Sequence, residues 1–304
     1  MGEEELRSRL VASFALAASF ALPQMAGAKE PIVLEPDRPW TLDYAEERCS
    51  LIRHFGNEKK GLQLQIDSYG SRAKFRFLVT GNYVPSSNKP AGLISVKFTP
   101  DDGFRKNQDA LLGKARKWNA VSFGAAFLPV EDAGLDDEGL SQKEIFQRAA
   151  EAESIRQEFE QATDSMTLHF ERLQDVHLKM GKMTKPLAAL RECIDNLYVS
   201  WGLDPAKLHT QSRAPIPDMK SVLQILSSYP VSMRYSGTSA FISVRIMVDE
   251  HGNATSCVVQ NNNADKPFRD AVCNSLASRF EPALDADGNP IASFYQTNVI
   301  YRIN

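Results

Sequence analysis

The sequence has few of the features that mark the common catalytic and nucleic-acid-binding classes. Its net charge at pH 7 is only −3, and no basic stripe alternates with aromatic residues, so nucleic acid is not an expected partner. A Gly-x-Ser-x-Gly elbow, an HExxH helix, a phosphate-binding glycine loop and a dinucleotide fingerprint are all missing. We therefore predict that the protein is not an enzyme and that it uses no cofactor.

Cysteine is also scarce, with four residues and no Cys-x-x-Cys pair. The absence of a Cys-x-x-Cys pair argues against a zinc knuckle and a redox dithiol. Cys257 and Cys273 lie on a predicted strand and on the helix expected to cover it, so we expect them to pair. Cys49 and Cys193 remain as partners across the N-terminal module. By chain entropy the short loop contributes about 3 kcal/mol and the long one about 5 kcal/mol; four buried free thiols are the alternative.

Long apolar runs are absent outside the first 28 residues. Arg7 and Arg9 precede an apolar run over 10–22, and 26–28 reads Ala-Gly-Ala, a small-x-small cleavage site. Residues 1–28 are therefore predicted to be a signal peptide, which would place the mature protein in the periplasm, an oxidising compartment that suits disulfides. An uncleaved inner-membrane anchor facing the periplasm is the alternative.

The overall fold class predicted is α+β, with a strand-rich N-terminal module that contains two helices. Residues 29–37 are expected to form an extended tether, residues 38–204 the N-terminal module, and residues 205–225 a proline-containing linker. Alternating apolar residues predict a hairpin of two strands over 62–66 and 75–79. The remaining elements expected in this module are strands over 93–98 and 121–127, a helix that follows the capping box Ser141-x-x-Glu144 and extends to Phe159, and a helix from Pro186 to Trp201 that ends at Gly202.

Two histidines of this module are candidate metal ligands. Residues 166–180 alternate as a second hairpin, and symmetric pairing about Leu173 would place His169 opposite His177 on its non-core face. A protein metal site needs three or four ligands. We therefore predict that this pair holds no metal.

The C-terminal stretch, 226–304, has the clearest pattern of the chain. Apolar residues of one parity over 240–248 predict a strand with one buried face and one wetter face, which carries Ser243 and Arg245. A turn over 249–253 leads to a second strand over 254–260. The elements that follow are a helix from Asp265 with an apolar stripe of Phe268, Val272 and Leu276, and a last strand from Ser293 to Ile303.

This stretch resembles the C-terminal domain of the TonB family of periplasmic energy transducers. The matching elements are Tyr229-Pro230, Val244-x-Ile246-x-Val248-Asp249-x-x-Gly252, Arg279-Phe280-x-Pro282-Ala283 and Gly288-x-Pro290. The resemblance implies a two-layer β-β-α-β domain that binds proteins and has no catalytic role. The chain departs from the family in its short linker and in having no histidine over 10–28, so we expect the binding domain without the energy-harvesting cycle.

In that family a sheet edge captures an extended segment of outer-membrane receptors by strand addition, which would make such a receptor or another peptide segment the partner and link the protein to transmembrane transport. The resemblance places this edge at the last strand and beside Tyr229-Pro230. Either the backbone edge or the shared side-chain face of the last strand could serve; that face carries Tyr295, Thr297, Val299 and Tyr301. The alternatives are a disulfide-stabilised scaffold or edge-to-edge homodimer with the function in the N-terminal module, and an enzyme whose catalytic residues lie far apart in sequence.

Overall fold

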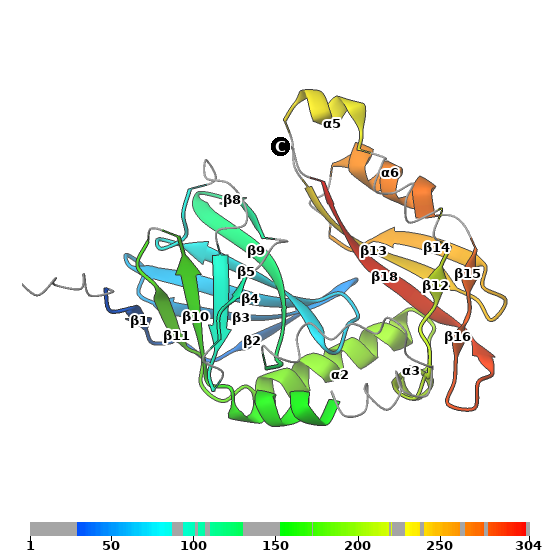
Figure 1. Cartoon of the computed structure of the whole chain (residues 1–304), viewed down its shortest axis with the longest axis horizontal. Helices are drawn as coiled ribbons and strands as arrows, with labels where there is room; N and C mark the ends of the chain where they lie inside the picture. The colour runs from blue at the N-terminus through cyan, green and yellow to red at the C-terminus, as the bar shows by residue number, and fades with distance from the viewer. Residues whose placement is uncertain are drawn as a thin grey trace, which may run out of the picture.

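The computed structural model describes residues 29–86, 94–100, 103–106, 110–129, 153–171, 173–218, 220, 229–237, 240–261, 265–276 and 279–301. The predicted signal peptide (1–28) and the capping box at Ser141 lie outside these residues. None of the helices described is both long and apolar enough to cross a membrane. The chain is an α+β protein in which two sheets and a long helix form the N-terminal module and a smaller sheet with one main helix forms the C-terminal module (Figure 1).

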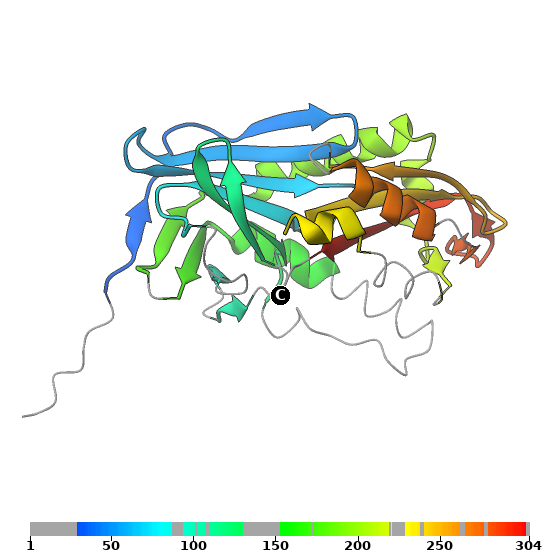
Figure 2. The same cartoon turned by 90° about the horizontal axis from the view of Figure 1, so that it is seen from above.

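The larger sheet of the N-terminal module has six antiparallel strands in the order β2-β3-β4-β5-β9-β8. Their bounds are β2 Thr41–Ala45, β3 Arg48–Gly56, β4 Gly61–Ser68, β5 Lys74–Gly81, β8 Leu111–Ala115 and β9 Trp118–Ala126. The predicted hairpin is confirmed, since β4 pairs with β5 in a register that sets Ile66 opposite Phe77. Figure 2 shows that this sheet extends toward the C-terminal module.

The smaller sheet has five strands in the order β1-β11-β10-β6-β7. Their bounds are β1 Ile32–Leu34, β6 Ile94–Phe98, β7 Arg105–Lys106, β10 Ser165–Phe170 and β11 Val176–Lys179. The prediction of a tether over 29–37 is wrong for β1, which pairs in parallel with β11. Pro36 also bridges to Phe55. The apolar Ile32-Val33-Leu34 run gains ladder hydrogen bonds there that a solvated tether would lack.

Phenylalanines from both sheets form the centre of the N-terminal core. The ring of Phe98 on β6 lies 5.8 Å from Phe77 on β5 and 4.9 Å from Phe127, which follows β9. Phe77 also stacks on Phe123 at 5.4 Å. All four rings are fully buried. The two sheets therefore pack face to face, and the six-stranded sheet turns its other, more polar face away from this core.

Helix α2 (Thr184–Ser200) closes the open end of the sandwich against β2 and β3. The predicted helix is confirmed, and Gly202 takes the left-handed conformation (φ +79°) that follows its end. Its buried apolar stripe consists of Leu187, Leu190, Cys193, Ile194 and Leu197. A shorter helix over 153–162 is tied to α2 by Glu160, which accepts from Arg156 at 2.8 Å and from Arg191 at 2.5 Å.

The predicted linker is more ordered than expected. Within 205–225 the structure forms α3 (Pro205–His209) and β12 (Ile216–Pro217). β12 pairs with β15 (Phe280–Glu281), and the Ser212 amide donates to the Leu284 carbonyl at 2.8 Å. The sequence 205–218 is thus part of the fold and not a free spacer, because its backbone groups bond to the C-terminal module.

The C-terminal module is a three-stranded antiparallel sheet with the order β14-β13-β18. Its elements are α5 Val231–Tyr235, β13 Ala240–Val248, β14 Ala254–Val259, α6 Lys266–Leu276, β16 Ala283–Leu284, β17 Pro290–Ile291 and β18 Ser293–Tyr301. Phe268 and Val272 of α6 are fully buried against this sheet. Gly252 in the β13–β14 turn has φ +78°, and a Cβ there would lie 2.1 Å from the Phe280 carbonyl oxygen, so only glycine fits.

Both predicted disulfides are confirmed. Cys49 on β3 bonds to Cys193 on α2, and Cys257 on β14 bonds to Cys273 on α6. Each bond therefore joins a sheet to the helix that covers it.

We expect the two bonds to differ in their contribution to stability. The sequence separations are 144 for Cys49–Cys193 and 16 for Cys257–Cys273. Replacing Cys49 and Cys193 together by Ser should lower the free energy of unfolding by about 5 kcal/mol, and the equivalent change at Cys257 and Cys273 by about 3 kcal/mol. Urea unfolding of the oxidised variants measures both; a larger loss from the short loop would contradict the chain-entropy explanation.

Candidate functional site

Strand β18 lies at one edge of the C-terminal sheet. It pairs with β13 over nine consecutive residues without a register shift. Its sequence, Ser-Phe-Tyr-Gln-Thr-Asn-Val-Ile-Tyr, contains no charged residue, no proline and no glycine. Natural edge strands are usually protected against pairing by such residues, by bulges or by short length. The other long edges are interrupted: Asp43 lies in β2, Lys114 in β8, and the ladder of β14 has a register shift beside Met247. β18 is therefore the least protected of the described long edges.

The hydrogen bonds that β13 makes to β14 determine which backbone groups of β18 point outward from the sheet. The Ser243 carbonyl accepts from the Gln260 amide on the β14 side, so Ser243 points its backbone groups away from β18. Since backbone direction alternates along a strand, the even residues of β13 bond to β18, and their partners on β18 are odd. The even residues of β18 then point their N–H and C=O groups outward. These residues are Phe294, Gln296, Asn298 and Ile300.

The side-chain face that the sequence offered as a binding surface belongs to the core. Val299 and Tyr301 are buried beneath α6, and the Tyr301 ring lies 4.9 Å from that of Phe268. Tyr295 and Thr297 have the same parity and are partly buried. Tyr229 closes the end of this core, 5.3 Å from the Tyr301 ring. Helix α6 covers the side-chain face of β18, so of the two predicted binding surfaces only the backbone edge of this strand is accessible in the described structure.

Pro230 lies at the N-terminus of α5, where its carbonyl accepts from the Met233 and Arg234 amides. Pro230 is partly buried, and helix α5 begins at the next residue. Tyr229 therefore contacts the last strand through the Tyr301 ring, whereas the hydrogen bonds of Pro230 are to the backbone of α5.

The opposite face of the C-terminal sheet, expected to be wetter, is buried against the N-terminal module. Figure 1 shows α6 on one side of this sheet and the N-terminal module on the other. Arg245 of β13 is only 5% exposed; it bonds to the Glu47 carboxylate at 2.7 Å and stacks over the Trp201 ring at 4.1 Å. Phe294 of β18 packs against Tyr198 and Trp201. The second face of the sheet is therefore an interface within the chain.

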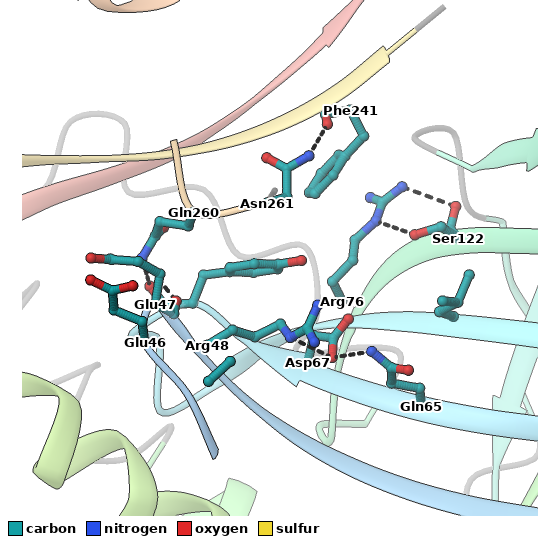
Figure 3. A pocket seen from close by; sticks show the side chains of 13 residues that line it. Glu46, Glu47, Arg48, Gln65, Asp67, Arg76, Ser122, Phe241, Gln260 and Asn261 are labelled. Carbon is teal, nitrogen blue, oxygen red and sulfur yellow. Dashed lines mark hydrogen bonds and ion pairs between the residues drawn. The ribbon is translucent and has the colours of Figure 1, made fainter. Parts of the chain in front are cut away.

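A cleft of about 410 Å³ lies in this interface, and we call it the intermodule cleft (Figure 3). Its floor is the polar face of the six-stranded sheet, and its roof comes from the C-terminal module. The floor residues are Ala45, Glu46, Glu47, Arg48, Gln65, Asp67, Tyr69, Arg76, Leu78 and Ser122; the roof residues are Phe241, Gln260 and Asn261. No motif in the sequence predicts this site. The signal for it was the presence of Asp67 and Arg76 inside strands, on the face that the alternation predicts to be polar.

Asp67 is the most buried acid of the cleft, with 4% of its surface exposed. Its carboxylate accepts from the Ser50 hydroxyl at 2.5 Å and from the Gln65 amide at 2.8 Å, and its Oδ1 lies 3.6 Å from Arg48 Nε. Burial nevertheless outweighs these favourable contacts and raises the pKa of Asp67 above its ordinary value. Burial likewise raises the pKa of Tyr69 to about 12. The floor therefore combines a desolvated acid with a neutral phenol.

Arg76 joins the floor to the roof. Its side chain donates to the Ser122 hydroxyl at 2.8 Å and to the Ser122 carbonyl at 2.9 Å, and its guanidinium lies 4.1 Å from the centre of the Phe241 ring. The side-chain amide of Gln260, on the roof, donates a hydrogen bond to the Tyr69 carbonyl at 2.9 Å. The walls of the cleft are thus held in place by contacts between the modules.

The histidine pair has a different register from the predicted one. On the hairpin His177 lies opposite Thr167, with which it shares a hydrogen bond of 2.9 Å. His169 instead contacts Asp175 at 2.7 Å. The prediction that the two imidazoles face each other is wrong, because pairing of β10 with β11 is shifted by two residues. Across the described residues no group of three or more His, Cys, Asp or Glu side chains is arranged to hold a metal ion.

Comparisons with protein-family models, with curated proteins and with solved structures find no match for this chain. The function must therefore be argued from the β18 edge and the intermodule cleft themselves.

We expect the charge of Asp67 to reduce stability as the pH rises. Because its pKa is raised in the folded state above 3.8, the folded chain binds this proton more tightly than the unfolded chain does. The free energy of unfolding should fall as the pH increases from about 3.8 to the raised pKa and then stop falling from this cause. Asp67→Asn should remove that fall, as measured by urea unfolding over a pH series. An unchanged pH profile in the variant would show that Asp67 does not titrate in this way.

The Arg245–Glu47 ion pair should contribute strongly to the packing of the two modules. Its side chains are 6% and 16% exposed. Arg245→Met leaves the largely buried Glu47 carboxylate without its partner and should lower the free energy of unfolding by about 3 kcal/mol. Lys266→Met is the matched control, since it breaks an exposed pair with Asp270 and should have little effect. Equal losses from the two variants would contradict the role of the buried pair.

Proposed function

We propose that this protein is an exported, TonB-like binding protein that takes up an extended segment of a partner protein as an additional strand along β18. The observation that carries the proposal is the long, uncharged, regular edge of β18, whose even residues point their backbone groups outward. Such an edge supplies affinity through main-chain hydrogen bonds, and neighbouring side chains supply register. The resemblance of 226–304 to the TonB family suggests an outer-membrane receptor as the source of the segment.

Two further features support an exported binding module. The elements from β13 to β18 occur in the order strand, strand, helix, strand, with only two-residue strands between α6 and β18. Two disulfides account for all four cysteines, and disulfides persist in oxidising compartments such as the periplasm. The element order is the one that the resemblance implies, and the disulfides are compatible with the predicted signal peptide.

The segment would lie along the second half of β18. At the start of the strand, Phe294 packs on Tyr198 and Trp201, and the Ser293 hydroxyl donates to Gln211 at 3.1 Å. Beyond this point, β18 residues 295–300 have no backbone hydrogen bonds to the described chain other than those to β13. The outward groups available to a partner are those of Gln296, Asn298 and Ile300.

A second copy of the chain is the competing occupant. Two β18 edges could pair with each other, since an isologous dimer would use the same outward N–H and C=O groups. The uncharged sequence of β18 favours this as much as it favours peptide capture. The oligomeric state and peptide binding must therefore be measured on the same variants.

Asn298→Pro tests the edge directly. The Asn298 N–H points outward, so proline there removes a donor that a partner strand would need and leaves the ladder to β13 intact. We expect a receptor-derived TonB-box peptide to shift the amide signals of 296–300 in the oxidised protein, and we expect Asn298→Pro to weaken its binding at least about tenfold.

The matched control is Asn298→Ala, which removes the same side chain but keeps the N–H and should bind normally. If peptides at millimolar concentration cause no shifts, receptor capture at this edge is wrong. If the protein instead dimerises and Asn298→Pro converts it to a monomer, the edge serves homodimerisation.

A further inference from the structure

One arginine of the intermodule cleft has hydrogen-bonding capacity that the described residues do not use. Arg48 Nε is buried and has no hydrogen-bond partner among them. Asp67 Oδ1 lies 3.6 Å from this Nε, and Asp43 Oδ2 lies 3.7 Å from Nη2 of the same guanidinium. Both carboxylates are ion-paired with Arg48, but neither is within hydrogen-bond distance. Burying an N–H donor without an acceptor is unfavourable, and a charged donor is more costly than a neutral one. The guanidinium also shares a side-chain hydrogen bond with Tyr69, and its remaining N–H donors could serve an acceptor in the cleft.

We propose that the intermodule cleft binds a small monocarboxylate, with Arg48 as its main ligand. The planar guanidinium can donate two parallel hydrogen bonds to the two oxygens of a carboxylate. The side chain of Arg48 is 29% exposed, so part of its guanidinium can be reached from the cleft, while Nε itself is covered. The cleft volume of about 410 Å³ falls in the range of small-molecule sites.

The charges around the cleft favour a ligand with a single negative charge over one with several. Its lining carries the carboxylates of Glu46, Glu47 and Asp67 and the guanidinium groups of Arg48 and Arg76. A phosphate dianion or a polyanion would be repelled by these carboxylates. The Glu47 carboxylate is already paired with Arg245, and a monocarboxylate placed at Arg48 adds only one charge, next to a cation.

The remaining lining suits an apolar or aromatic body. Leu78 lies on the floor beside Arg76, and the Tyr69 and Phe241 rings, 6.5 Å apart, come from the two modules. Figure 3 shows the Phe241 side chain on the roof and Arg48 on the floor of the same cleft. A ligand that spans this distance would contact both modules, so its binding should also stabilise their packing.

Benzoate is the probe, and benzamide is its neutral control of similar shape. With the full oxidised protein we expect calorimetry to show saturable benzoate binding at millimolar concentration or below and no binding of benzamide. The Arg48 Nε–H signal in the NMR spectrum should shift with benzoate. Equal binding of benzamide, or no binding of benzoate, would overturn the proposal.

Three variants locate the site. Arg48→Gln should weaken benzoate binding at least about tenfold, because it removes a charged hydrogen-bond donor. Leu78→Trp should block the cleft without changing any charge, which keeps the test decisive if Arg48→Gln does not fold. Arg38→Gln is the control, since Arg38 is an exposed arginine on the N-terminal module, and it should bind normally. Benzoate binding that survives Leu78→Trp would place the ligand elsewhere and overturn the proposal.

Discussion

The architecture depends on the packing of the C-terminal sheet against the polar face of the six-stranded sheet. A three-stranded sheet covered by one helix still has a second face, and here that face carries Arg245. Its charge can be buried only because Glu47, in the β2–β3 turn, lies within hydrogen-bond distance. The guanidinium also stacks on Trp201. This one residue is therefore in contact with a strand turn and a helix end of the other module.

This packing limits how the C-terminal module can bind a partner. One face of its sheet lies beneath α6 and the other lies against the N-terminal module, so neither is available as a flat docking surface. What remains is the edge of β18, where the proposed recognition would rest on backbone groups. The same packing creates the intermodule cleft, because the two sheets meet through long polar side chains that leave space between them. The two proposed sites are thus consequences of one interface.

The two disulfides hold in place the helices that pack around this interface. Cys193 fixes α2 to β3, and α2 also supplies Tyr198, whose hydroxyl donates to the Gly70 carbonyl and whose ring packs on Phe294. The helix that closes the N-terminal sandwich is therefore also part of the support for the start of β18. The Cys257–Cys273 bond holds α6 on the other face of the same sheet.

The sequence by itself determined the local elements and their inward faces, because periods of two and 3.6 residues depend only on neighbouring positions. It predicted the β4–β5 hairpin, α2, the strands and helix of the C-terminal module, and both disulfides. Tertiary structure alone decided what covers each face. Arg245 and Asp67 occupy positions that alternation marks as polar, yet both are buried, since a second sheet from far along the chain lies over them. For the same reason β1 was expected to be a tether: its partner β11 is more than a hundred residues away. Pairing between distant segments depends on the complete fold, and periodicity carries no information about it.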